Sequence, residues 1–444
     1  MPRIRSRLVT AAATVMLVAA PPGATPAPPA AAGAVSPAPS PAGQPGPEVG
    51  APGPRPSDVS QRVAGARPLW MKRIDRLVGR KSFGVAIEVD DHVLYKRAAV
   101  TRRIPASNQK LLLSMSLLAR FDPESRLQTT AATGGRKGNV VTGNLWLLGT
   151  GDPWLGTRAA YGRRLPAGMT SLHVLARRVA DSGIRSIRGG VIGSTGYFSH
   201  DWWAPGWKAH FPAYYVALPS ALTFNGNLAG GRHISDPERR AATWFTRKLE
   251  KLGVRVRRRP AAEPAPQGLT EVASIKSKPL QILMRYMNVR SSNTVAELLG
   301  KRLGVNRFGR PGTIAKGARA VRAWARRHGV DIESLDSSGL SYRNRISARG
   351  MARLLDRVEE KPWGALLRGM LPAPGQGTLA DRLRGVRVRA KTGTLDRVST
   401  LSGWVWLSRT QQWASFSIMS SGLPKSKAAD IENRIVRILH ERAR

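Results

Sequence analysis

Three short polar strings, in a fixed order along the chain, restrict what this sequence can fold into more than any other feature. They are Ser107-Asn108-Gln109-Lys110, then Ser291-Ser292-Asn293, and then Lys391-Thr392-Gly393. A Ser followed by a Lys three positions later occurs often by chance in a chain with 71 Lys and Arg residues, so one string alone indicates little. All three in order are far more specific, provided that each lies on a suitable helix, turn or strand.

The first string lies at the predicted start of an apolar helix. Apolar residues follow Ser107 at helical spacing up to Leu118, and Pro105 ends whatever precedes them. Lys110 would then lie one turn beyond Ser107 on the same helix face. A Ser hydroxyl becomes a good nucleophile when a neighbouring base takes its proton, and a Lys can do so when burial keeps it neutral. The simpler alternative is that Ser107 only caps the helix and Lys110 is solvated.

The second string lies between two helical patterns, at 280–287 and 295–299. By itself, such a polar segment predicts only a turn between two helices. In the functional interpretation, Ser291 relays a proton toward a leaving amine, and Asn293 donates a hydrogen bond to the backbone of a substrate.

The third string follows an alternating strand pattern at 386–390, and two more strand-like runs come after it. Gly393 in an edge strand would let a second backbone, such as that of a peptide, approach closely. Lys391 and Thr392 offer donors to a carboxylate, and the N–H of Thr394 would share an oxyanion hole with that of Ser107. The alternative, an ordinary turn in a basic protein, leaves the ordered set of three strings unexplained.

In combination, the strings resemble the S-x-x-K, S-x-N and K-T-G set of the low-molecular-mass class C (type-4) penicillin-binding proteins, which are D-alanyl-D-alanine carboxypeptidases and endopeptidases. The likeness extends from about residue 68 to the C-terminus. Further segments resemble landmarks of the same family: the Gly-Asp-Pro segment at 145–153, Pro205-Gly206-Trp207, Tyr214-Tyr215, 219–225, the Asp-x-Ser-Gly-Leu-Ser loop at 336–341, and 371–372 with 377–379.

The resemblance implies an α/β (α+β) fold of the penicillin-binding and serine β-lactamase-like kind, with an antiparallel five-stranded sheet and helices on both faces. Local patterns predict a helix at 69–78, strands at 83–89 and 92–98, and a last helix at 427–442. The long stretch between Ser107 and Ser291 predicts a smaller inserted mixed α/β domain at 139–270. The peptidase domain then comprises 58–138 and 271–444. Because a helical pattern at 241–252 follows Asn225 closely, we expect the insertion to be reduced relative to the longest relatives.

The N-terminal residues are typical of an exported protein. Basic residues precede an apolar run at 8–20 that is too short to span a bilayer, which predicts a signal peptide within 1–34, cleaved between 20 and 34. A Pro/Ala-rich stalk follows at 35–57. We expect no transmembrane anchor after cleavage, and a location in the cell wall, the periplasm or the extracellular space. The chain has no Cys, which excludes disulfides and thiol catalysis.

The formal net charge of +43 is the second unusual feature. Such a charge often indicates nucleic-acid binding, but the arginines are scattered and no aromatic-interleaved nucleic-acid motif accompanies them. Anionic wall polymers are the expected partners instead. The seven His residues are dispersed, and no metal-ligand spacing, Rossmann fingerprint or P-loop is present, so no metal or cofactor is expected.

The resemblance implies a penicillin-sensitive serine peptidase that acts on peptidoglycan stem peptides through an acyl-enzyme, with β-lactam antibiotics as covalent inhibitors. It implies a site in which Ser107, Lys110, Ser291, Asn293 and Lys391 are catalytic, and Thr392, Gly393 and Thr394 bind substrate.

Two alternatives remain open. A β-lactamase would need a carboxylate for fast deacylation, and the region 326–333 lacks the Glu-x-x-x-Asn arrangement that supplies it. A non-catalytic wall-binding protein would explain the charge, but it would not require three intact motifs.

The sequence leaves the balance between carboxypeptidase and endopeptidase activity open, and we expect both. The aromatic residues Trp202, Trp203, Trp207, Tyr214 and Tyr215 are candidates for contacting the third residue of the stem peptide. Their packing within the insertion is an equally good interpretation.

Overall fold

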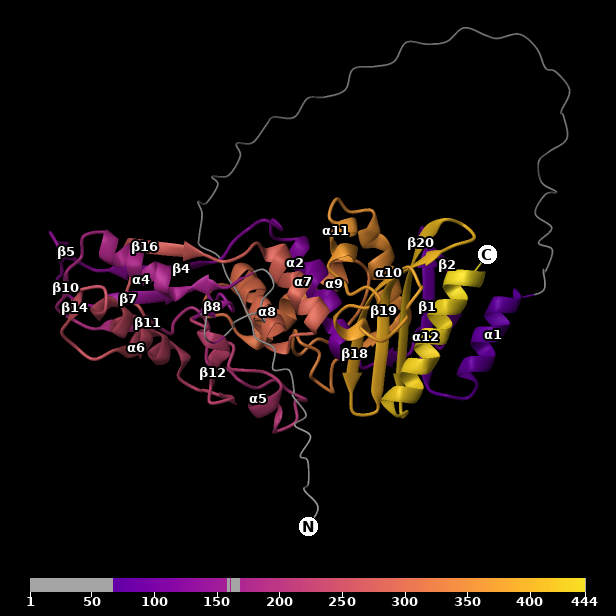
Figure 1. Ribbon diagram of the computed structural model, residues 1–444. Coiled ribbons are helices and arrows are strands. Elements are labelled where there is room, and N and C mark those ends of the chain that lie inside the picture. The colour runs from indigo at the N-terminus through magenta and orange to yellow at the C-terminus, as the bar shows by residue number, and fades with distance from the viewer. Residues whose placement is uncertain (1–66, 158–159, 161–167, 444) are drawn as a thin grey trace, which may run out of the picture.

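The computed structural model describes residues 67–157, 160 and 168–443 (Figure 1). The predicted signal peptide and stalk lie outside these residues. Within them, no helix is both long enough and apolar enough to cross a bilayer. Figure 1 shows two units beside each other, with the inserted strands at the left, the five-stranded sheet at the right, and helices α2, α7 and α8 between them.

The centre of the peptidase domain is a five-stranded antiparallel sheet in the order β18-β19-β20-β1-β2. This confirms the predicted sheet, in which two N-terminal strands join three C-terminal ones. All seven residues of β1 are buried, because helices cover both faces of the sheet. The strands are β1 (Phe83–Val89), β2 (His92–Arg97), β18 (Val388–Leu395), β19 (Val398–Leu407) and β20 (Gln412–Ser421).

Helices α1 (Leu69–Val78) and α12 (Lys425–Arg442) pack together on one face of this sheet. The predicted helix at 69–78 coincides with α1, and α12 starts at Lys425 rather than at 427. On the other face, α10 (Ala348–Glu359) contacts β1 and β20, with a helical layer beyond it. That layer comprises α2 (Gln109–Leu118), α7 (Leu280–Arg290), α8 (Asn293–Phe308), α9 (Ile314–Arg327) and α11 (Gly364–Gly369).

The inserted unit is built on a second five-stranded sheet, in the order β15-β11-β7-β4-β16. The pairs within β15-β11-β7 are parallel and those within β7-β4-β16 are antiparallel, so the sheet is mixed. Helices α4 (Leu172–Asp181) and α6 (Pro237–Glu250) share its apolar core. The strands are β4 (Gln128–Thr133), β7 (Leu145–Gly149), β11 (Val191–Ser194), β15 (Ala261–Glu263) and β16 (Thr270–Lys276).

The predicted limits of the insertion, 139 and 270, are narrower than this sheet. β4 lies before 139, and β16 begins at Thr270, yet the two strands pair with each other and β4 pairs with β7. Pairing between residues so distant along the chain leaves no local pattern in the sequence. We therefore propose that the inserted unit extends from β4 to β16.

Several short elements complete the described chain. A four-stranded sheet in the order β14-β10-β6-β5 lies at the far end of the insertion. The short elements are β3 (Arg102–Arg103), η1 (Ala106–Asn108), β5 (Arg136–Lys137), β6 (Val140–Val141), β8 (Leu155–Gly156), β9 (Thr170–Ser171), β10 (Ser186–Ile187), α5 (Phe211–Tyr214), η3 (Asn225–Asn227), β12 (Leu228–Ala229), β13 (Arg232–His233), β14 (Arg255–Val256), β17 (Ile346–Ser347) and η4 (Gly377–Leu379).

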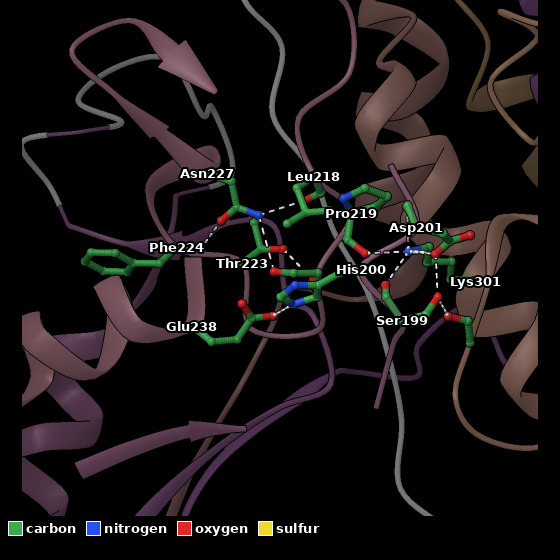
Figure 2. A network of polar contacts seen from close by, with 12 residues as sticks. Ser199, His200, Asp201, Leu218, Pro219, Thr223, Phe224, Asn227, Glu238 and Lys301 are labelled. Atoms are coloured by element: carbon green, nitrogen blue, oxygen red, sulfur yellow. Dashed lines mark hydrogen bonds and ion pairs between the residues drawn. The ribbon is translucent and has the colours of Figure 1, made fainter. Parts of the chain in front are cut away.

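The segment between β11 and α6 crosses from the insertion to the peptidase domain. Figure 2 shows its anchor, the fully buried Lys301 of α8. The Lys301 Nζ lies 2.5 Å from Asp201 Oδ1 and donates to the carbonyl oxygens of Ser199 at 2.8 Å and Pro219 at 3.0 Å. One buried cation thereby holds both ends of the loop at 199–219, which forms one wall of the candidate active site.

Candidate active site

Ser107 lies in the 3₁₀ turn η1, which leads directly into α2. The residue before it, Ala106, has a φ of 46°, in the left-handed region that a Cβ disfavours. The two residues between Ser107 and Lys110 are fully buried and hold the turn in place. Asn108 Nδ2 donates to Ser402 Oγ of β19 at 2.7 Å, and Gln109 Nε2 donates to Ser334 Oγ at 2.7 Å. The turn is thus attached to the sheet on one side and to the loop before residue 336 on the other.

Lys110 is fully buried, and its Nζ has three oxygen neighbours. These are Ser107 Oγ at 2.9 Å, Asn293 Oδ1 at 2.9 Å and the carbonyl oxygen of Ser338 at 2.5 Å. A neutral amine has two N–H groups and one lone pair. Since two of the neighbours can only accept, the lone pair of a neutral Lys110 would face the one neighbour that can donate, the Ser107 hydroxyl.

The electrostatics favour the neutral form of Lys110. Burial lowers its pKa from 10.5 to about 7, although the nearby carboxylates of Asp336 and Glu297 raise it. Desolvation penalises the charged form of a buried amine, so it overrides the attraction of the two carboxylates. At neutral pH, this arrangement can take a proton from Ser107.

A buried carboxylate on α8 holds the loop that Lys110 contacts. The side chain of Glu297 accepts hydrogen bonds from the backbone N–H of Ser338 at 2.7 Å and of Ser337 at 3.1 Å. Burial, followed by the charge of Asp336, raises the pKa of Glu297 to about 8. The sequence analysis did not identify Glu297, because no pattern in the sequence marks an acid that folds back onto a distant loop.

Asp336 organises the same loop from within. It accepts from the backbone N–H of Gly339 at 2.9 Å and of Ser341 at 2.7 Å, and from Trp207 Nε1 at 2.7 Å. The loop at 336–341 was noted only as a family landmark. In the structure it contributes the Ser338 carbonyl oxygen that Lys110 contacts, so it supports the base directly.

Ser291 and Lys391 form a second Ser-Lys pair in the site. Ser291 ends α7 with a φ of 54°, and its hydroxyl lies 2.8 Å from Lys391 Nζ. Lys391 is fully buried and also donates to the carbonyl oxygen of Thr392 at 2.7 Å. Burial, together with the charge of Lys110, holds the pKa of Lys391 well below its ordinary value. Each of the two lysines therefore has a serine hydroxyl within hydrogen-bond distance.

Asn293 begins α8 and connects two walls of the site. Its Oδ1 accepts from Lys110, and its Nδ2 donates to the carbonyl oxygen of Tyr215 at 3.1 Å. The prediction assigned Nδ2 to the substrate backbone. Here one of its two hydrogens is engaged by the segment that crosses from the insertion, which leaves the other for a ligand.

Gly393 lets the third string lie directly against the Ser107 turn. A Cβ at this position would lie 2.1 Å from Thr400 Oγ1 and 2.8 Å from the carbonyl oxygen of Pro105, which are closer than real Cβ contacts, and a tight 3.0 Å from Ser107 N. Thr392 and Thr394 flank it and line the cleft. The space beside Gly393 was predicted to admit a substrate backbone. In the structure, the protein's own backbone at Pro105 and Ser107 lies there.

These residues open into a cleft of about 670 Å³. The nucleophile candidate Ser107 lines it together with Ser291, Asn293, Thr392 and Thr394. Lys208 and His210 line it from the crossing segment, and Arg382 and Lys425 from the peptidase domain. Asp396 is the one acidic side chain among the described lining residues. The cleft is suited to a substrate that carries negative charge.

The aromatic candidates occupy three kinds of position. Only Tyr215 lines the cleft, as far as the described residues show. Trp207 is buried and donates to Asp336, and Trp202 Nε1 donates to the carbonyl oxygen of Val216 at 2.9 Å. Trp203 and Tyr214 are exposed outside the cleft. For Trp202 and Trp207, packing is the interpretation that the contacts favour.

Among the described residues, no three His, Asp or Glu side chains come together in a way that could hold a metal ion. The chemistry of the site can be described with its own serines, lysines and backbone N–H groups. A cleft-lining Ser beside a buried Lys, with a second Ser, an Asn and a second Lys next to them on this sheet, defines an acyl-transferring serine enzyme of the penicillin-binding class.

Comparison with known proteins gives the family. Residues 74–232 and 228–442 match the model of the D-Ala-D-Ala carboxypeptidase 3 (S13) family. The chain is 30% identical to Carboxypeptidase Rv3627c of Mycobacterium tuberculosis, over 74% of this chain and 73% of that protein. It is 27% identical to the D-alanyl-D-alanine carboxypeptidase of an Actinomadura species, over 74% and 75% of the two chains. The chain belongs to the D-Ala-D-Ala carboxypeptidase 3 (S13) family and is a serine-type D-Ala-D-Ala carboxypeptidase.

Solved structures agree on the fold. Penicillin binding protein 4 of Haemophilus influenzae superposes with a TM-score of 0.72 at 20% identity, over 84% of this chain and 99% of that one. A structure of the same protein complexed with a β-lactam matches with a TM-score of 0.64 at 20% identity, over 83% and 99% of the chains. These matches confirm the expected fold class.

Proposed function

We propose that this protein hydrolyses the terminal D-alanyl-D-alanine bond of peptidoglycan stem peptides through an ester on Ser107. The Ser107 Oγ attacks the carbonyl carbon while its proton moves to Lys110 Nζ. Backbone N–H groups of Ser107 and Thr394 stabilise the oxyanion. The C–N bond then breaks as the proton held by Lys110 is relayed through Ser291 to the leaving amine. Water later hydrolyses the ester, which releases the acyl half as a carboxylic acid and regenerates Ser107. The observation that carries this proposal is the buried Lys110 amine, 2.9 Å from Ser107 Oγ.

In this mechanism, the carboxylate of the leaving D-alanine binds to Lys391 and Thr392. Lys391 is fully buried, and its lowered pKa favours the neutral form in the free protein. An arriving carboxylate would raise that pKa, because an opposite charge within a few ångströms stabilises the ammonium form. Substrate binding therefore favours the ammonium form of Lys391.

The charge of the cleft supports the same substrate class. Four cationic or titratable basic residues and one acid line it in the described chain, namely Lys208, His210, Arg382, Lys425 and Asp396. Arg382 is already paired with the buried Glu432 at 2.7 Å, and Lys208 Nζ lies 3.9 Å from the Asp396 carboxylate. Among the described lining residues, His210 and Lys425 are therefore the bases left for carboxylates of a stem peptide.

β-Lactam antibiotics are proposed as covalent inhibitors for the same reason, since their strained amide presents a carbonyl carbon and a carboxylate to the same groups. The test is labelling with a fluorescent penicillin and release of D-alanine from a monomeric pentapeptide. Wild-type protein should show both, and Ser107→Ala should show neither. Labelling that persists in Ser107→Ala would place the nucleophile elsewhere.

Export and wall retention are proposed from the charge and from the N-terminal sequence pattern. One surface in the described chain is well suited to polyanions. It is a groove of about 750 Å³ between α1 and α12, and its lining has five basic side chains, Arg73, Arg76, Lys81, Arg434 and Arg437, and one acid, Glu441. We propose that anionic wall polymers bind there, with an affinity that falls steeply with salt because binding releases counterions.

Endopeptidase activity is proposed alongside carboxypeptidase activity. Both reactions form the same ester on Ser107 and differ only in the amine that leaves. To measure the two activities separately, cross-linked muropeptides are used as substrates. Free D-alanine reports the carboxypeptidase activity, and monomers derived from dimers report the endopeptidase activity.

A further inference from the structure

A second groove, of about 540 Å³, runs along the outer face of α7. We refer to it as the α7 groove. Its floor and sides include Trp154, Ile282, Arg285, Tyr286, Arg290 and Gln376. The Trp154 and Tyr286 rings meet edge to face, with centroids 5.3 Å apart and an interplanar angle of 86°.

The α7 groove adjoins the cleft, because consecutive residues of the chain line the two. Arg290 lines the groove and the next residue, Ser291, lines the cleft; Gly377 lines the groove and Thr378 lines the cleft. The two boundaries also touch each other, because a Cβ on Gly377 would lie 2.1 Å from the carbonyl oxygen of Val289. The last turn of α7 and η4 therefore form a common wall of groove and cleft.

This common wall lies at one particular end of the cleft. Ser291 is within 2.8 Å of Lys391 Nζ, at the start of the cleft-lining part of β18. Asp396 follows the other end of that strand, about 16 Å away at the rise of an extended chain. In the proposed mechanism, the leaving amine departs at the Ser291 and Lys391 end. A peptide attached to that amine would extend toward the α7 groove.

The chemistry of the α7 groove fits an anionic peptide. Arg285 and Arg290 are exposed beside an aromatic floor, and none of its described lining residues is acidic. The Nη1 of Arg285 donates to the carbonyl oxygen of Gly369 at 2.8 Å, which holds the guanidinium at the rim. Burial, and after it the charge of Arg285, lowers the pKa of Arg389, so the positive field of Arg285 reaches this neighbour.

We infer that the α7 groove binds the leaving half of a cross-linked substrate, a short peptide whose free carboxylates contact Arg285 and Arg290. A free D-alanine ends at Lys391 and Thr392 and does not reach this groove. The groove thus selects cross-linked peptides without taking part in the chemistry that both reactions share. This inference rests on the proposed function, since it uses the direction in which the amine leaves.

The test compares two substrates on the same protein preparations. Arg285→Glu combined with Arg290→Glu should raise KM for cleavage of a cross-linked muropeptide dimer by about tenfold, since each rim charge contributes a factor of a few. Release of D-alanine from the monomeric pentapeptide and acylation by a fluorescent penicillin should stay within about twofold. The lysine pair Arg285→Lys with Arg290→Lys should largely restore dimer cleavage. Arg257→Glu with Arg258→Glu, at exposed positions of the insertion, is the charge-matched control and should leave both reactions unchanged.

A second measurement needs no variant. The tetrapeptide monomer, which both halves of a dimer become after cleavage, should inhibit dimer cleavage more strongly than D-alanine release, because only the dimer uses the groove. Equal loss of both reactions in the groove variant, or no loss in either, would overturn the inference. So would a wild-type protein that trims pentapeptides and leaves every dimer intact, although the carboxypeptidase proposal would then stand. Groove variants that cut dimers normally but lose retention on isolated walls would reassign the groove to wall polymers.

Discussion

The pH dependence of acylation is the sharpest test of Lys110 as the base. Burial lowers its pKa from 10.5 to about 7, and this shift corresponds to about 5 kcal/mol in favour of the neutral amine. At pH 7 about half of the Lys110 side chains can accept a proton, whereas an ordinary Lys would be neutral in about 0.03% of molecules. At pH 5 the neutral share falls to about 1%. Because only the neutral form can deprotonate Ser107, the acylation rate should fall as the pH drops through 7.

The assay is the second-order rate constant for labelling by a fluorescent penicillin between pH 5 and 9, with folding checked at each pH by circular dichroism. We expect a plateau above about pH 7 and a tenfold decrease per pH unit below it. Lys110→Arg keeps the positive charge but cannot lose its proton in this range, so it should not acylate at any pH. A rate that is flat from pH 5 to 9, or a midpoint above pH 9, would refute Lys110 as the base in this environment.

Three further predictions concern two residues that support the site and the basic groove between α1 and α12. Lys301→Met should lower the free energy of unfolding by about 3–5 kcal/mol, because it leaves the Asp201 carboxylate and three carbonyl oxygens without their buried cation. Urea titration measures this, and Lys361→Met, at an exposed position, is the control that should match wild type. Gly393→Ala should slow penicillin acylation about 100-fold, because the added Cβ would clash with Thr400 Oγ1 at 2.1 Å and with the Pro105 carbonyl oxygen at 2.8 Å, and would displace the turn that carries Ser107. Gly369→Ala has no atom within 4 Å of its Cβ and should acylate normally; equal rates in the two variants would contradict this reasoning. Retention on isolated cell walls should decrease steeply with NaCl concentration and with a shallower slope for Arg434→Glu with Arg437→Glu; retention that is constant across that range would remove the electrostatic explanation.

The elements with strong local patterns were predictable from the sequence. The helix at 69–78 matches α1, because its apolar residues recur on one face, at Trp70, Ile74 and Val78, and all three are buried against α12 and the sheet. The strand at 83–89 matches β1 for a different reason. It is buried along its whole length, so a nearly unbroken apolar run between polar turns was sufficient to identify it.

Features that depend on distant parts of the chain were not predictable. β4 and β16 pair across the whole insertion, so neither strand carries a signal that assigns it to that unit. The position of Ser107 in a 3₁₀ turn before α2, rather than in the helix, depends on Ser402 and Ser334, which hold Asn108 and Gln109 from opposite sides. The roles proposed for Ser107, Lys110, Ser291, Asn293 and Lys391 remain predictions, although the structure brings all five side chains together.

The buried acids Asp336 and Glu297 are the part of the site that was least predictable from the sequence. They explain how the pKa of Lys110 can lie near 7. Burial alone would drive the pKa of Lys110 lower still, and a base of very low pKa would have little affinity for the proton of Ser107. The charge of Asp336 acts in the opposite direction, and so does Glu297 in the molecules in which it is ionised, since its own pKa is raised to about 8. Both acids are held in place by the loop N–H groups, and Asp336 also by Trp207. A Lys buried without these acids would be neutral but weakly basic, and a Lys beside them in water would be permanently charged. The value near 7 results from both effects together, so α8 and the loop at 336–341 set the working pH of a base that lies on α2.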